Sequence, residues 1–219
     1  MSAPDASLRI GPRRPQARMV CVFVHGRGQS PEEMETGVLS RLDAPDVAFL
    51  LPRAPKGAWY EARAVDPLTS ATRSALDEAI DQLAAAMDEA RAAFPGVPVL
   101  LGGFSQGACL SIEYVCRGLS TPDALIAFTG CRVGTPQDDR PDDLPKGLPV
   151  YLSGGDADPW IPVTAFADAA LSLGRSGVRL RADLFPGRGH EVCDAEIAMM
   201  ASVLTDLSSG RAVGFGAPR

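Results

Sequence analysis

One serine in this chain has a sequence setting typical of an enzymatic nucleophile. Gly-Phe-Ser-Gln-Gly at residues 103–107 fits the pattern Gly-x-Ser-x-Gly, follows the apolar run Val97–Leu101 and opens a helical pattern at Gln106–Gly118. Flanking glycines allow a strand to turn sharply into a helix, and that turn exposes the serine hydroxyl. A serine that only caps a helix after a Gly-rich turn is the alternative. The strand–turn–helix context favours Ser105 as a nucleophile.

A serine hydroxyl becomes a good nucleophile only when a neighbouring base removes its proton. The chain has two histidines, His25 and His190. His25 ends an apolar run upstream of the serine, whereas His190 follows the last apolar run in a glycine-rich loop. A residue at the end of the last strand can reach the serine turn at the same sheet edge. We therefore predict His190 as the general base and expect His25 to belong to the loop that binds an oxyanion.

Two aspartates compete for the role of orienting the histidine ring. Asp156 and Asp158 both follow an apolar strand pattern, and Pro159 fixes the turn directly after the second. Asp158 is the better candidate, and Asp156 is expected to bond the backbone of its own turn. The order Ser105, Asp158, His190 is that of α/β-hydrolases. A metal site from these aspartates and His190 lacks a further histidine or cysteine, so we predict none.

An oxyanion hole needs two backbone N–H groups directed at the oxygen that gains charge. The residue after the serine, Gln106, supplies one at a helix N-terminus. We assign the second to Arg27, which lies between Gly26 and Gly28 after a buried strand pattern. These glycines are not a dinucleotide fingerprint, because Pro31 occupies the position of the third glycine.

These residues require a scaffold, and the periodicity of the chain indicates one. Short apolar runs typical of buried parallel strands alternate with helical patterns, which predicts an α/β fold, in one domain, with a mostly parallel central sheet flanked by helices. The expected strands are Met19–Val24, Val47–Leu51, Val97–Leu101, Ala124–Phe128, Leu148–Leu152 and Val178–Leu184. The expected helices are Pro31–Leu42, Ser70–Ala93, Gln106–Gly118, Val163–Leu173 and Asp194–Leu207.

Composition excludes several other classes of protein. The 219 residues include 46% hydrophobic ones, enough for a core without metals or disulfides. A net charge of −6 argues against a nucleic-acid partner, and the apolar runs are too short to span a membrane. Five scattered cysteines without a Cys-x-x-Cys pair indicate thiols and a cytoplasmic location.

We expect three segments along the chain. Residues 1–18 are interpreted as a flexible lead-in, because the apolar run after Arg13 and Arg14 is too short for a secretion signal. Residues 19–207 form the α/β-hydrolase domain, without room for a large lid. Residues 208–219, rich in Gly, Ala and Arg, are expected to form a loose tail.

Five motifs together resemble the phospholipase/carboxylesterase family, which includes bacterial carboxylesterases and acyl-protein thioesterases. They cover most of the chain, from Met19 to Leu207. The motifs are His-Gly-x-Gly at 25–28, Ala-Pro-Lys-Gly-Ala-Trp-Tyr at 54–60, Gly-Phe-Ser-Gln-Gly-Ala at 103–108, Gly-Asp-x-Asp-Pro-x-Ile-Pro at 155–162 and Gly-His-Glu at 189–191.

The resemblance implies a catalytic triad of Ser105, Asp158 and His190 and a substrate-binding role for Trp59, which matches an aromatic residue of the acyl pocket. Tyr60 is expected to form the same wall, although Trp59 is also compatible with a core position. Arg27 stands where the thioesterases usually have leucine.

We therefore expect a serine carboxylesterase that needs no cofactor and acts on small-molecule esters of short to medium acyl length. An acyl-protein thioesterase or lysophospholipase of the same family is the alternative, and a non-catalytic binding protein of this fold is a third. A peptidase of this fold usually carries an added domain that 219 residues cannot hold. The sequence leaves a homodimer open.

Overall fold

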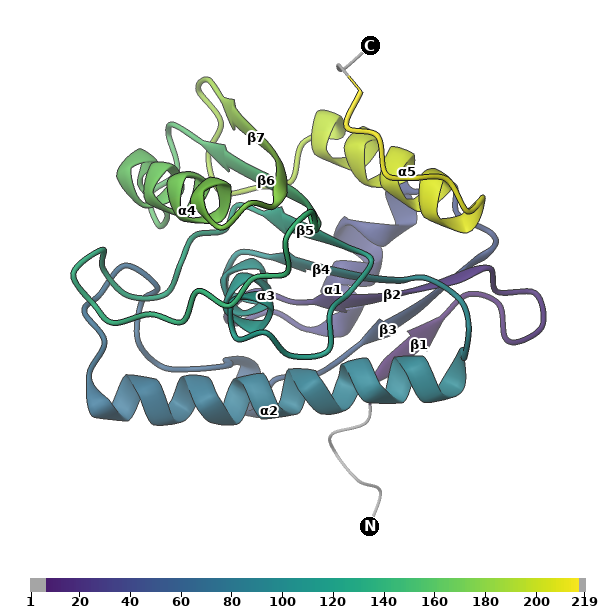
Figure 1. Cartoon of the computed structure of the whole chain (residues 1–219), viewed down its shortest axis with the longest axis horizontal. Coiled ribbons are helices and arrows are strands. Elements are labelled where there is room, and N and C mark those ends of the chain that lie inside the picture. Colours follow the sequence, from purple (N-terminus) through teal and green to yellow (C-terminus); the bar gives the residue numbers. More distant parts are fainter. Residues whose placement is uncertain (1–6, 217–219) are drawn as a thin grey trace.

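The computed structural model describes residues 7–216 and is built around a twisted sheet (Figure 1). The sheet has seven strands in the order β1-β3-β2-β4-β5-β6-β7 within these residues. Strands β2 to β7 run parallel, and β1 pairs antiparallel with β3. The strands are β1 (Leu8–Ile10), β2 (Met19–Val24), β3 (Val47–Leu51), β4 (Val99–Phe104), β5 (Ala124–Phe128), β6 (Pro149–Gly155) and β7 (Arg179–Phe185).

Helices cover both faces of the sheet, as Figure 1 shows, with α2, α3 and α4 on one face and α1 and α5 on the other. Strand β2 illustrates this layering, because successive side chains of a strand point to opposite faces of the sheet. Val20, Val22 and Val24 pack in the core beneath α2, α3 and α4, and Phe23 packs in the core beneath α1 and α5. The helices are α1 (Pro31–Gly37), α2 (Ser70–Ala93), α3 (Gln106–Cys116), α4 (Val163–Arg175) and α5 (Asp194–Ser208). The predicted α/β fold is therefore confirmed.

Two expected segments differ from the structure. Within the expected lead-in, Leu8–Ile10 forms an edge strand, which is too short to show a periodicity in sequence and is followed by Gly11 with a φ of 86°. Within the expected loose tail, Val213 is buried and its carbonyl accepts a hydrogen bond from Arg179 at 2.7 Å. These are corrections to the predicted flexible lead-in and loose tail; residues 1–6 and 217–219 lie outside the described part.

Helix α1 is shorter than the predicted Pro31–Leu42. It ends at Gly37, and a separate 3₁₀ turn, Leu39–Arg41, follows. Two small features of the chain account for the break: glycine weakens a helix interior, and the β-branched Val38 adopts a non-helical conformation between the two segments. The other predicted helices begin at the expected residues.

Candidate active site

Ser105 occupies the sharp turn between β4 and α3 in a strained backbone conformation. Its φ of 56° and ψ of −120° lie in a region that non-glycine residues rarely adopt, which costs about 1–3 kcal/mol. The surrounding structure holds this conformation: the Ser105 N–H donates to Phe128 O at 2.9 Å, and the Ser105 carbonyl accepts from Cys109 N at 3.0 Å. The strain presents the hydroxyl above the carboxyl edge of the sheet.

The two glycines of the motif are required by close backbone packing. A Cβ at Gly103 would lie 2.5 Å from the carbonyl carbon of Gly107, and a Cβ at Gly107 would lie 2.1 Å from Val24 O. Both distances are far below van der Waals contact. The motif therefore allows β4, α3 and β2 to meet directly beneath Ser105.

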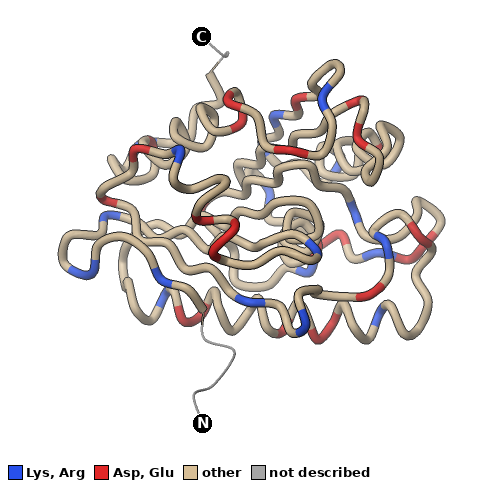
Figure 2. The backbone as a smooth tube through the Cα atoms, turned by 180° about the vertical axis from the view of Figure 1, so that it is seen from behind, with Lys and Arg blue, Asp and Glu red and all other residues tan. Residues whose placement is uncertain are grey.

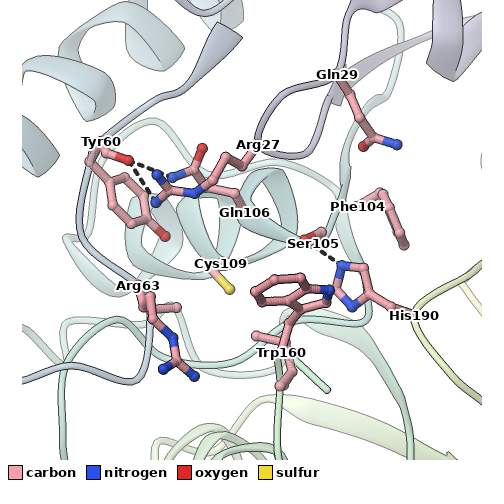
Figure 3. Close-up of a pocket in the computed structure, with 12 residues that line it drawn as sticks. Arg27, Gln29, Tyr60, Arg63, Phe104, Ser105, Gln106, Cys109, Trp160 and His190 are labelled. Atoms are coloured by element: carbon pink, nitrogen blue, oxygen red, sulfur yellow. Dashed lines mark hydrogen bonds between the residues drawn. The ribbon is translucent and has the colours of Figure 1, made fainter. Parts of the chain in front are cut away.

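The structure brings the three predicted triad residues together (Figure 3 shows the Ser105–His190 contact). Nε2 of His190 lies 2.8 Å from Oγ of Ser105, and Nδ1 of His190 lies 2.7 Å from Oδ2 of Asp158. The Asp158 side chain is fully buried and that of His190 is 20% exposed. Because a carboxylate accepts from Nδ1–H, the ring presents an unprotonated Nε2 to the serine hydroxyl. This arrangement suits proton removal from Ser105.

The two neighbouring aspartates have different partners. Oδ1 of Asp158 accepts from the backbone N–H groups of Trp160 and Ile161 at 2.7 and 3.0 Å, so this residue closes its own turn as well as contacting His190. Asp156 is exposed and accepts from Gly187 N at 2.6 Å, in the loop after β7. The expectation that Asp156 bonds its own turn is therefore corrected. The Asp156 contact joins two loops that flank the site.

A buried polar network, which sequence reasoning missed, supports the His190 loop. Nη1 of Arg188 donates to Glu191 O, to Oγ1 of Thr129 at 3.1 Å and to Oε2 of Glu196 at 3.2 Å. Oε1 of Glu196 accepts from the Ser153 hydroxyl. Buried charges require partners of this kind, so a charged residue two positions before the histidine was the available signal. The network fixes the loop that carries His190.

The two predicted oxyanion-hole groups lie on opposite sides of Ser105 along the chain. Within residues 7–216, the N–H groups of Arg27 and Gln106 donate to no other residue. Gln106 is the first residue of α3, where backbone N–H groups have no partner inside the helix. The side chain of Gln29 holds the other loop by accepting from Gly26 N at 3.2 Å. Both N–H groups are therefore free to receive an anionic oxygen.

His25 is a buried structural residue of this loop. Its Nδ1 lies 2.8 Å from Gly26 O, and its Nε2 accepts from Ala54 N at 3.0 Å. Donation to Gly26 O therefore places the proton on Nδ1 and requires a neutral ring. Burial lowers the pKa of His25 below its ordinary value of 6.5, with Arg53 acting in the same direction and the contact with Gly26 O opposing it.

This environment predicts a pH-dependent stability. The unfolded chain binds a proton at His25 more readily than the folded chain, so the stabilisation is complete above the ordinary pKa and is lost as pH falls from there toward the lowered folded pKa. We expect the free energy of unfolding of His25→Asn to change less than that of the wild type between about pH 8 and about pH 5.5. Urea titrations at both pH values measure this difference. Equal changes in the two proteins would contradict the assigned role.

A cavity of about 320 Å³ opens beside the Ser105 hydroxyl (Figure 3). Tyr60 lines it, as predicted, but Trp59 does not: its indole N–H donates to His25 O at 2.9 Å and its side chain packs in the core. This corrects the expected Trp59 wall. Trp160, with 60% of its surface exposed, lines the cavity instead. Its position two residues after Asp158 was the only signal in the sequence.

The side chains of Arg27 and Gln106, the two residues predicted to form the oxyanion hole, hold the wall that Tyr60 belongs to. The Gln106 amide accepts from Trp59 N at 3.0 Å and donates to Tyr60 O at 2.7 Å. The Arg27 guanidinium donates to the carbonyls of Tyr60, Glu61 and Ala62 at 2.9, 3.0 and 2.5 Å. The wall is therefore fixed to the two residues whose N–H groups are predicted to bind the oxyanion.

Three further observations concern metal ligands, membrane-spanning helices and thiols. Residues 7–216 contain no group of three or more His, Cys, Asp or Glu side chains that could hold a metal ion. In the same part of the chain, we find no helix long and apolar enough to cross a bilayer. All five cysteines are free thiols.

Known proteins resemble this chain in sequence and in fold. The family model described as Phospholipase/Carboxylesterase matches residues 6–208. An acyl-protein thioesterase 1 from Neurospora crassa is 25% identical over 211 residues, covering 84% of this chain and 85% of the relative. The crystal structure of a phospholipase/carboxylesterase from Dyadobacter fermentans superposes with a TM-score of 0.80 at 26% identity, covering 94% of this chain and 98% of the other. Esterase PE8 superposes with a TM-score of 0.78 at 24% identity, covering 94% and 100%.

Proposed function

Because the chain belongs to the phospholipase/carboxylesterase family, we propose that it is a serine carboxylesterase that hydrolyses short- to medium-chain esters through an acyl-enzyme intermediate. The observation that carries this proposal is the hydrogen-bonded series Ser105, His190, Asp158 at 2.8 and 2.7 Å. Each residue type in that series has a defined role in ester hydrolysis.

In the first half of the reaction, His190 Nε2 accepts the proton of Ser105 as Oγ attacks the ester carbonyl carbon. The negative oxygen of the tetrahedral intermediate accepts hydrogen bonds from the N–H groups of Arg27 and Gln106. Asp158 stabilises the positive imidazolium. His190 then donates its proton to the departing alcohol, and the acyl group remains on Ser105.

Water completes the cycle by the same route in reverse. His190 removes a proton from water, and the resulting hydroxide attacks the acyl carbonyl. Collapse of the second tetrahedral intermediate releases the carboxylic acid and returns the proton to Ser105. The strained Ser105 backbone, φ 56°, keeps Oγ directed at the substrate throughout.

The class of ester that the enzyme prefers is a separate part of this proposal. Named relatives include acyl-protein thioesterases, so a thioesterase is the second candidate. The family is described as Phospholipase/Carboxylesterase, which makes a lysophospholipase a third. Hydrolysis of a 4-nitrophenyl ester series, with a thioester and a lysophospholipid alongside, discriminates these classes. Absence of turnover on every member would favour a non-catalytic binding protein. We place the protein in the cytoplasm because its five cysteines are free thiols.

The open cavity predicts a preference for limited acyl length. Each buried methylene contributes about 0.8 kcal/mol, and the gain ends where the chain leaves the pocket, so kcat/KM should peak at about C4 to C8. Trp160→Ala should lower kcat/KM for C8 esters by about three- to tenfold and that for acetate esters much less. Steady-state kinetics on the ester series measures both effects.

A matched control is Leu171→Ala, which also removes an exposed apolar side chain, 59% exposed, from helix α4. This variant should keep the wild-type profile. A profile that still rises at C16, or one that Trp160→Ala leaves unchanged, would contradict the assignment of the acyl site.

A further inference from the structure

The cavity beside Ser105 has a charge opposite to that of the whole chain. The protein carries a net charge of −6, and its acidic and basic residues are interspersed along the backbone (Figure 2). The described residues that line the cavity nevertheless include two arginines, Arg27 and Arg63, and no aspartate or glutamate. In the view of Figure 3, both guanidinium groups lie to the left of Ser105, whereas His190 lies to its right.

Arg63 is anchored by its backbone and not by its side chain. Its N–H donates to Oδ2 of Asp66 at 3.3 Å, which fixes the main chain at the rim of the cavity. Among residues 7–216, no carboxylate lies within 4 Å of the Arg63 guanidinium and no hydrogen bond engages it. Arg63 is exposed, so its charge is available to a ligand at the rim.

Arg27 also carries a charge that no carboxylate of residues 7–216 compensates. Its partners are the three carbonyl oxygens of residues 60–62, which are neutral. A guanidinium has five N–H donors, so two of them remain for a ligand. The carbonyls hold this side chain rigidly against the Tyr60 wall. A rigid guanidinium loses less entropy when it binds an anion than a mobile one.

From these two side chains we propose that the preferred substrates carry an anionic group, a carboxylate or a phosphate, which Arg63 and Arg27 bind beside the ester. This inference rests on the ester hydrolysis proposed above and names its substrate class. The reaction itself is unchanged: water is consumed, and an acid and an alcohol are released. Trp160 and Phe104 leave an apolar part of the same cavity for the carbon chain.

The size of the effect follows from exposure. Arg63 lies at the surface, where an ion pair contributes modestly and is screened by salt. Arg27 is held in place by three backbone carbonyls and adds hydrogen bonds to a charged group, which are stronger than those between neutral groups. We therefore expect an anionic substrate to exceed its neutral counterpart in kcat/KM by about fivefold or more at low salt, with a smaller ratio at high salt.

The test compares paired esters of equal carbon number. One pair places the anion on the acyl side: mono-4-nitrophenyl adipate against 4-nitrophenyl hexanoate. A second pair places a phosphate on the alcohol side: hexanoyl glycerol phosphate against hexanoyl glycerol, with hexanoate release followed by chromatography. The arm that shows the preference identifies whether the ligand is a carboxylate or a phosphate.

The variants are Arg63→Gln and Arg63→Glu, with Arg175→Gln as the matched control. Arg175 is exposed at the C-terminal end of α4, a helix of 13 residues whose other end adjoins the site. We expect the anionic-to-neutral ratio to fall about two- to threefold in Arg63→Gln, where Arg27 remains, to fall further in Arg63→Glu and to remain at the wild-type value in Arg175→Gln.

Two results separate this inference from the proposed function. A wild-type ratio near one in both arms, or an unchanged ratio in Arg63→Glu, would overturn the anion site while esterase activity stands. Failure to hydrolyse any ester would instead refute the proposed function. The anion site would then be tested by ligand binding, measured as a change in melting temperature. Adipate or glycerol phosphate should raise the melting temperature of the wild type, and the neutral 1,6-hexanediol should not. Loss of this increase in Arg63→Glu would support the anion site. No increase in the wild type would overturn the anion site.

Discussion

Replacing Ser105 with alanine should lower kcat/KM for 4-nitrophenyl hexanoate by about 10⁴-fold or more. Alanine has no hydroxyl to form the acyl-enzyme, and water attacking directly in its place would still benefit from the two oxyanion N–H groups. A residual rate above background is therefore expected. The Cβ of alanine occupies the same position as that of serine, so the backbone around residue 105 need not change.

The control for this variant is Ser176→Ala, whose hydroxyl donates to Asp142 and to Ser172 O at the end of α4. It should retain wild-type kinetics. Far-UV circular dichroism and the melting temperature of Ser105→Ala should match those of the wild type. Turnover within tenfold of the wild type in a folded Ser105→Ala protein would rule out Ser105 as the nucleophile.

Asp158→Asn should have the second largest effect, a loss in kcat of about 10⁴-fold. The N–H groups of Trp160 and Ile161 hold an oxygen at the Oδ1 position, so the amide NH₂ must face Nδ1 of His190. That contact favours the tautomer with its proton on Nε2, which cannot accept the proton of Ser105. The substitution therefore removes the base while preserving most of the turn.

Asp156→Asn is the matched control, because it makes the same chemical change two residues away. Its contact with Gly187 N can be kept by the amide oxygen, so kcat should fall by less than about tenfold. Pre-steady-state and steady-state kinetics on both variants decide the assignment. A larger loss in Asp156→Asn than in Asp158→Asn would reverse the roles of the two aspartates.

Much of the scaffold could be predicted from sequence because its strands are buried on both faces. Met19–Val24 and Ala124–Phe128 are continuous apolar runs, and the structure has strands with those bounds. Strands β4 and β6 extend further than predicted, through glycines at their carboxyl ends. Glycine has low strand propensity, yet here it allows backbones and helices to approach the site.

The wall of the cavity could not be predicted in the same way. Trp59 and Trp160 both lie within the sequence motifs, and the residue type does not reveal which one faces the ligand. Hydrogen bonds decide: the Trp59 indole donates to His25 O, and its N–H donates to Gln106. These partners are far from Trp59 in sequence, so only the three-dimensional arrangement places its ring in the core.

The roles of two arginines near the site could not be predicted from sequence either. Arg188 and Arg63 look alike in sequence, as single arginines in polar loops. Arg188 is buried against Glu196, whereas Arg63 is exposed at the rim of the cavity. The first supports the histidine loop and the second is available to a ligand. Burial, which depends on long-range packing, separates the two roles.

Covalent labelling tests the central claim, nucleophilic catalysis by Ser105, most directly. The protein is treated with a fluorophosphonate, digested and mapped by mass spectrometry, with Ser105→Ala and His190→Ala treated in parallel. The structure, in which His190 Nε2 lies 2.8 Å from Ser105 Oγ, predicts an adduct on the peptide containing Ser105, none at that position in Ser105→Ala and much slower labelling in His190→Ala. An adduct on a different residue, or ester hydrolysis that continues in protein whose Ser105 is fully labelled, would contradict the claim.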